Sequence, residues 1–235
     1  MGAEGTHVIG TIVFDLDGTL ALGDGPIVAY ARSLARVAGD GFLTTAEAEL
    51  ASFAAGDSGY RDGYHAVGTA AEHAGIASDD VSAAYETSRD VLGTPAAPVA
   101  PPAGIADLLR DLAGDARLVL ATNAPDAGVR ELLADWGIAD LFSAMHFTVG
   151  KPDGLSAVIR GALEDGPVLS IGDIAEFDLA PAAALGADTA LVGATCDSSP
   201  FPATLRGRTI ADLSDDLRAW TAAAASGSSP AHLTA

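Results

Sequence analysis

The chain contains very little positive charge. Its 235 residues include 12 lysines and arginines against 32 aspartates and glutamates, which gives a net charge of −20. Nucleic acids and anionic membrane surfaces both need a basic footprint on their partner, so this charge argues against either. The sequence also lacks an apolar run long enough to cross a bilayer, and an N-terminal basic segment followed by an apolar stretch. We therefore expect a cytoplasmic protein with no nucleic-acid or membrane partner.

Cysteine and lysine are almost absent, with one residue of each. Cys196 cannot form an intrachain disulfide and has no Cys or His neighbour at metal-ligand spacing, so we interpret it as structural. Lys151 is more informative, because the other strongly basic residues are all arginines. A compact ammonium on a flexible stem suits a phosphoryl site better than a planar guanidinium does. A surface lysine without a specific role is the alternative.

Apolar runs alternate with helical stretches after residue 100. The runs predict short strands, and the sequence between them predicts helices. Such alternation is typical of an α/β fold in which helices cover both faces of a parallel sheet. A further β-branched run leads into Phe14 and predicts a first strand near the N-terminus. The predicted strands after residue 100 are 116–122, 144–149, 166–173 and 187–193.

Residues from about 21 to 100 break this alternation, because they contain helical patterns and no convincing strand. Glycines at 22–26 and prolines at 95–102 flank the stretch, as expected of two connecting segments. The last residues are small and polar and predict a disordered tail. We therefore divide the chain into core 1–20, an all-helical insert 21–100, core 101–220 and a tail 221–235.

The stretch VFDLDGTL, at 13–20, places Asp15 and Asp17 directly after an apolar run. Alternate side chains of a strand share a face, so the two carboxylates point the same way if the extended conformation continues that far. Two like charges at that spacing cost energy unless a cation or a shared proton relieves them. A pair of solvated turn aspartates is the alternative.

Other polar residues follow the later predicted strands. Thr122 and Asn123 follow one strand, and Asp173 and Asp178 follow another. Ligands of an open parallel sheet bind outside the carboxyl ends of its strands, so we expect these residues to converge with Asp15 in one crevice.

These residues, in this order, resemble the four motifs of the haloacid dehalogenase (HAD) superfamily. The resemblance covers about 1–20 and 101–210, and it implies a Rossmann-like core with a helical cap inserted after the first motif. The superfamily includes phosphatases, phosphomutases, phosphonatases and dehalogenases, and the fold alone does not choose among them. The matching motifs are Asp15-x-Asp17-Gly18-Thr19, Thr122-Asn123, Lys151-Pro152 and Gly172-Asp173-x4-Asp178.

On this resemblance, Asp15 is expected to be a nucleophile that forms an aspartyl-phosphate. Mg²⁺ would be held by Asp15, the backbone carbonyl of Asp17 and Asp173, while Asp178 supports this shell or orients Lys151. Asp17 would protonate the leaving oxygen and later deprotonate the attacking water.

The phosphoryl oxygens are expected to meet Thr122, Lys151 and the backbone N–H groups near Gly18 and Asn123. Dehalogenases of the superfamily lack the second aspartate, and its phosphonatases use a cap lysine that this chain does not contain. We therefore expect a Mg²⁺-dependent phosphatase of a small phosphorylated metabolite, as a monomer or homodimer. A sugar-phosphate mutase and a non-catalytic protein that binds Mg²⁺ or phosphate are the alternatives.

The cap offers one further candidate segment, SGYRDGYHAVG at 58–68, which brings together Tyr60, Arg61, Tyr64 and His65. Arg61 would suit a carboxylate or a second phosphate of the substrate. The alternative is that all four are ordinary surface and inter-helix residues.

Overall fold

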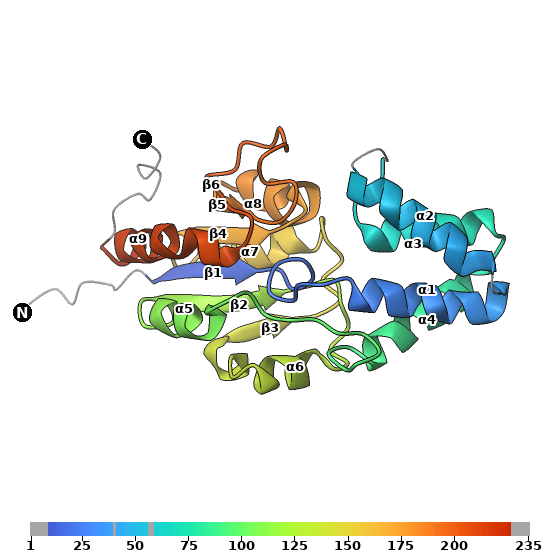
Figure 1. The fold of residues 1–235 in the computed structure, drawn as a ribbon. Helices are drawn as coiled ribbons and strands as arrows, with labels where there is room; N and C mark the ends of the chain where they lie inside the picture. Colours follow the sequence, from blue (N-terminus) through green and yellow to red (C-terminus); the bar gives the residue numbers. More distant parts are fainter. Residues whose placement is uncertain (1–8, 40, 56–58, 227–235) are drawn as a thin grey trace, which may run out of the picture. The chain divides into compact units, whose positions relative to one another are not determined.

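The structure is a computed structural model that describes residues 9–39, 41–55 and 59–226 (Figure 1). The chain divides into two compact units. The core unit runs through Leu22 and resumes over Pro101–Asp126 and from Leu133 onward. The helical unit comprises Gly23–Ala100 and Ala127–Leu132. Within the described residues, no helix is both long and apolar enough to cross a membrane.

The core unit contains a six-stranded sheet in which every pairing is parallel. The strand order is β3-β2-β1-β4-β5-β6, so the N-terminal strand lies in the middle of the sheet. Val13 of β1 stands opposite Val119 on one side and Ser170 on the other. The strands are β1 (Gly10–Phe14), β2 (Ala116–Ala121), β3 (Ala144–His146), β4 (Val168–Gly172), β5 (Asp188–Leu191) and β6 (Leu205–Arg206).

Helices cover both faces of this sheet, which confirms the predicted α/β class. Because side chains alternate along β1, Val13 packs with Leu155 and Ile159 of α7 on one face. Gly10 faces the other way, where a Cβ would lie only 2.8 Å from Ala224 of α9. The core helices are α5 (Ile105–Leu112), α7 (Leu155–Leu163), α8 (Ala180–Ala183) and α9 (Ser214–Ala225), while α6 (Val129–Asp135) begins in the helical unit and ends in the core unit.

The predicted strands differ from the observed ones at two places. The strand expected over 144–149 ends at His146, because the chain turns at Thr148, which has a left-handed φ of 47°. The N–H groups of Thr148 and Val149 then donate to the carbonyls of Ala124 and Thr122. The two-residue strand β6 was not predicted at all.

The tail predicted from residue 221 begins too early. Helix α9 continues to Ala225, and Thr221 and Ala224 on it are buried. Trp220 holds the helix in place, since its side chain is buried and its Nε1 donates to Asp188 Oδ2 at 2.8 Å. The prediction for 227–235 lies outside the described residues.

The helical unit contains only helices and short irregular segments in its described part, with α1 and α4 packed along one another (Figure 1). Tyr30, Leu34, Phe42 and Val67 form its apolar centre with several alanines. Residues 127–132, predicted within core 101–220, belong instead to this unit, because Leu132 packs onto Gly93. The helices are α1 (Gly25–Ala38), α2 (Gly41–Ala55), α3 (Gly63–His73) and α4 (Ser78–Asp90).

Candidate active site

Asp15 lies at the carboxyl edge of the sheet. Strand β1 ends at Phe14, and the N–H of Asp15 still donates to the Ile171 carbonyl at 2.9 Å. The chain then closes into a tight loop, because the N–H groups of Leu20 and Ala21 both donate to the Leu16 carbonyl at 2.8 Å. Asp17 lies in this loop rather than in the strand, so the alternation of strand side chains does not determine where it points.

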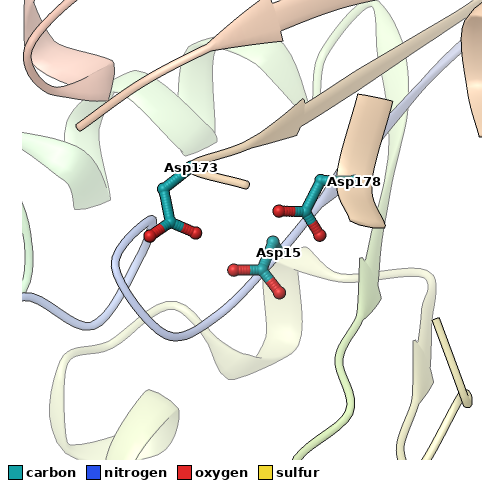
Figure 2. Close-up of side chains that lie close together, drawn as sticks. All are labelled: Asp15, Asp173 and Asp178. Atoms are coloured by element: carbon teal, nitrogen blue, oxygen red, sulfur yellow. The ribbon is translucent and has the colours of Figure 1, made fainter. Parts of the chain in front are cut away.

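Three carboxylates meet at this edge (Figure 2). Oxygen atoms of Asp15, Asp173 and Asp178 all lie within 4.8 Å of one another. Asp173 directly follows β4, and Asp178 lies in the π-helical turn Ala175–Leu179. The parallel sheet therefore brings together residues that are far apart in sequence, as the strand-end argument predicted.

Asp178 is held by several contacts with its own segment. Its Oδ2 accepts from the Ile174 N–H at 3.0 Å, and its backbone carbonyl accepts from Ser170 Oγ at 2.7 Å. A Cβ on Gly172 would come within 2.2 Å of the Asp178 Cβ, so only glycine allows this turn to lie so close to the strand end. The carboxylate of Asp178 is thus fixed before any ligand binds.

Lys151 bridges two of the carboxylates. Its Nζ donates to Asp15 Oδ1 at 2.6 Å and to Asp178 Oδ1 at 2.7 Å, and its side chain is only 3% exposed. The backbone N–H of Lys151 donates to Asn123 Oδ1 at 2.7 Å, which fixes the loop that carries the lysine. Burial lowers the pKa of Lys151, but attraction to Asp15 and Asp178 outweighs it and raises the pKa above its ordinary value. The ammonium therefore stays charged.

Asp173 has no comparable partner. Its Oδ1 is buried and accepts no hydrogen bond from any described residue. The carboxylate lies directly over Gly18, where a Cβ would come within 2.2 Å of Asp173 Oδ2. Burial first, and then the charges of Asp15 and Asp178, hold the pKa of Asp173 well above its usual range. Asp17 is close enough to add to this effect.

The site therefore has more negative charge than Lys151 can balance. Burial and the Asp15 charge raise the pKa of Asp178 to about 7 in spite of the lysine beside it. Three carboxylates around one ammonium would be relieved by a cation, and the buried, unsatisfied Oδ1 of Asp173 provides a ligand for it. Carboxylate oxygens are the donors that Mg²⁺ prefers, so the residues present fit this ion.

We expect Asp173→Asn to stabilise the metal-free protein. The amide keeps the shape of the side chain but removes a carboxyl that costs free energy to bury, either as an anion or by taking up a proton on folding. The free energy of unfolding should therefore rise by about 1–2 kcal/mol. Mg²⁺ should stabilise the wild type through preferential binding to the folded state, and should have less effect on the variant. Thermal unfolding in EDTA and in Mg²⁺ measures both effects. The exposed Asp115→Asn is the matched control, and a loss of stability in metal-free Asp173→Asn would contradict the prediction.

The remaining predicted site residues lie in two places. Thr122 is buried at the end of β2, where its Oγ1 accepts from the Ala124 N–H at 3.0 Å, and Asn123 follows it. Gly18 lies in the loop after Asp15, with a left-handed φ of 81°. The structure therefore places these three at the same sheet edge as the carboxylates. Their contacts with a phosphoryl group remain a prediction.

Arg61 lies in the helical unit. Its backbone N–H donates to His65 Nδ1 at 3.2 Å. Its side chain is 45% exposed, and its Nε lies 3.9 Å from Asp62 Oδ2. Tyr60 and Tyr64 each have partners within the same unit, because Tyr60 donates to Glu49 Oε2 and Tyr64 accepts from a buried arginine. These contacts tie both tyrosines to other residues of the helical unit, while the substrate-binding role of Arg61 stays a prediction.

Sequence reasoning missed two supports of the site. Asn123 was expected to contribute only a backbone N–H to the phosphoryl site. Its side chain also accepts a hydrogen bond from the backbone N–H of Lys151. Ser170 was not singled out, although a hydroxyl in an otherwise apolar strand signals a specific partner, here the carbonyl of Asp178. The first support joins residues 28 positions apart in sequence, and the second joins residues eight apart across the turn after β4.

The family model for haloacid dehalogenase-like hydrolases matches residues 12–189. The chain belongs to this family. The match confirms the resemblance of the four motifs, and it spans both parts of the core together with the helical unit. A search of curated proteins found no match.

Solved structures of HAD proteins share the fold at low identity. YfnB, a HAD-hydrolase from Bacillus subtilis bound to magnesium, is 18% identical with a TM-score of 0.60, over 89% of this chain and 98% of its own. CbbY from Rhodobacter sphaeroides, in complex with phosphate, is 21% identical with a TM-score of 0.60, over 87% and 96%. A 2-haloacid dehalogenase from Pseudomonas syringae is 21% identical with a TM-score of 0.55, over 90% and 99%.

Proposed function

We propose that this HAD hydrolase is a Mg²⁺-dependent phosphatase that acts on a small phosphorylated metabolite through an aspartyl-phosphate at Asp15. The observation that carries the proposal is the cluster of Asp15, Asp173 and Asp178, in which the buried Lys151 pairs with Asp15 and Asp178. The unsatisfied Oδ1 of Asp173 adds to it, because a buried carboxylate oxygen without a donor is costly unless a cation binds there.

Asp15, Asp173 and the backbone carbonyl of Asp17 are the groups that would hold the ion. When bound, Mg²⁺ would reduce the repulsion between the Asp15 carboxylate and the anionic phosphate and would orient the phosphoryl group. Asp178 is better placed as a support, because both of its carboxylate oxygens already accept hydrogen bonds. The magnesium-bound state of YfnB, on the same fold, supports this assignment.

The chemistry of the chain's own residues takes two steps. A carboxylate oxygen of Asp15 attacks phosphorus, the bond from phosphorus to the ester oxygen breaks, and that oxygen takes a proton from Asp17. A water molecule then attacks the phosphorus of the aspartyl-phosphate, gives its proton to Asp17, and releases phosphate and the free Asp15 carboxylate. Lys151 would orient Asp15 throughout and balance charge on the phosphoryl oxygens.

Thr122 and the N–H groups near Gly18 and Asn123 would complete the phosphoryl site. The phosphate complex of CbbY supports a phosphoryl ligand on this fold. A sugar-phosphate mutase would use the same core residues and differ in the fate of the phosphoryl group, so product analysis separates the two. A non-catalytic binding protein would have no use for Asp17 beside the nucleophile.

A dehalogenase is the second candidate, because one structural relative is a 2-haloacid dehalogenase. Displacement of a halide by Asp15 would need neither a proton donor at Asp17 nor a cation to offset phosphate charge. The excess of carboxylates around Lys151 therefore favours phosphoryl transfer over dehalogenation.

We expect the protein to hydrolyse p-nitrophenyl phosphate in the presence of Mg²⁺ and to lose this activity in EDTA. Addition of Mg²⁺ above the chelator concentration should restore it, because removing the ion leaves the nucleophile and the phosphate to repel each other. Release of p-nitrophenol, followed by absorbance, measures the rate. Undiminished turnover in EDTA would contradict the metal-dependent proposal, and metal-independent release of halide from a 2-haloacid would favour the dehalogenase.

A further inference from the structure

The helical unit contains a pocket of about 390 Å³. Its wall comes from α1, α3 and α4, and three of the chain's four tyrosines contribute to it. The volume falls within the range of small-molecule sites, and the proposed hydrolysis makes no use of this pocket. The lining residues are Tyr30, Tyr64, Val81, Ser82, Tyr85 and Glu86.

The three tyrosine rings form a compact cluster with differently oriented planes. The ring centroids of Tyr64 and Tyr85 are 5.5 Å apart at an interplanar angle of 73°, and those of Tyr30 and Tyr85 are 6.2 Å apart at 86°. Tyr30 is buried, Tyr64 and Tyr85 are half-buried, and all three line the pocket. Because the face of an aromatic ring carries negative electrostatic potential, this surface attracts positive charge.

Two acidic side chains near the rings strengthen this attraction, whereas the charge of one buried arginine opposes it. Glu86 lines the pocket and is exposed, and Glu72 is close enough to Tyr30 to raise, together with the larger effect of burial, the pKa of its phenol. Arg89 is the positive group at the cluster, where its Nη1 donates to Tyr64 Oη at 3.1 Å. Its side chain is fully buried, so it fixes the Tyr64 ring without adding surface to the pocket.

We propose that this tyrosine pocket binds an organic ammonium ion of the quaternary, methylated type. Such a cation is weakly hydrated and has no N–H groups to satisfy, so ring surface and one carboxylate are sufficient to recognise it. A primary ammonium is a compact and strongly hydrated charge, so it loses more hydration free energy than a methylated one when it enters a pocket. The proposal does not depend on the phosphatase activity.

The test compares choline with its neutral isostere, in which a quaternary carbon replaces the nitrogen. Both are titrated into the full chain at constant ionic strength, and binding is followed by ligand-observed NMR. Choline should bind roughly ten-fold more tightly than the isostere, because only the cation interacts with ring quadrupoles and Glu86. Equal affinity for both ligands would show an apolar pocket without cation recognition and would overturn the proposal.

Variants assign the binding to the pocket. Tyr85→Leu keeps an apolar side chain but removes a ring, so choline affinity should fall by about ten-fold, whereas Tyr85→Phe should keep it. Tyr60→Leu is the matched control, because it removes the one tyrosine that does not line the pocket. If Tyr85→Leu does not fold, Glu86→Gln replaces an exposed side chain and should weaken choline binding several-fold. The proposal would be overturned if the variant that folds binds choline as tightly as the wild type does.

Discussion

Asp15→Asn should remove phosphatase turnover while leaving the fold intact. The amide is a poor nucleophile, so the loss should reach roughly four orders of magnitude or more. The fold should survive because asparagine is nearly the same shape and its side-chain oxygen can still accept the hydrogen bond from Lys151. The change also removes one of three crowded negative charges, so the metal-free variant should be no less stable than the wild type.

Three measurements separate this expectation from simple damage. Steady-state hydrolysis of p-nitrophenyl phosphate gives the rate, thermal unfolding gives the stability, and the mass of acid-quenched protein reports a phosphoryl adduct. The adduct should form on the wild type and be absent from the variant. The exposed Asp115→Asn controls for the same chemical change outside the site. Near-wild-type turnover in Asp15→Asn would mean that another group attacks phosphorus.

Much of the core could be predicted from the sequence because its signals are local. A buried parallel strand is nearly continuously apolar, and a polar residue directly after it lies at the sheet edge. Asp15, Thr122 and Asp173 all follow such strands, and the structure places all three at that edge. The helical pattern of 21–100 was equally local, and the described part of that stretch contains no β-strand.

The contacts that hold the site rigid were beyond local patterns. Asn123 reaches Lys151 across 28 residues of sequence, and Lys151 reaches Asp15 across 136. Neither contact can be predicted from the spacing of apolar residues. The same holds for the end of the chain, where small and polar residues suggest disorder, yet burial of Trp220 against the sheet keeps α9 helical to Ala225. Tertiary packing, rather than intrinsic helix propensity, therefore determines where this helix ends.

The charge of the site can be compared with the charge of the whole chain. The net charge of −20 is spread over exposed side chains, where water and salt screen it. The three carboxylates at the sheet edge are largely shielded from water, so their mutual repulsion is much stronger for each pair. An acidic protein can therefore contain one acidic cluster with a specific function, and it is burial rather than composition that distinguishes it.

Asp17→Asn should separate the two half-reactions of the proposed mechanism. Loss of a positioned proton donor and acceptor typically costs ~10²–10⁴-fold in rate. Metal binding should persist, because Asp17 is expected to hold the ion through its backbone carbonyl, which the substitution keeps. Thermal stabilisation by Mg²⁺ should therefore match that of the wild type.

The size of the loss should depend on the leaving group. p-Nitrophenolate departs readily without a proton, whereas an alkoxide needs one, so an alkyl phosphate should lose more of its kcat/KM than p-nitrophenyl phosphate does. With p-nitrophenyl phosphate, Asp15 can still be phosphorylated, but no base remains to activate the water that removes the phosphoryl group. Rapid mixing should therefore show a burst of about one p-nitrophenol per active site, and acid-quenched protein should carry the phosphoryl group on Asp15. Equal losses for both esters, with no burst and no trapped phosphoryl group, would show that Asp17 is not the residue that moves the protons.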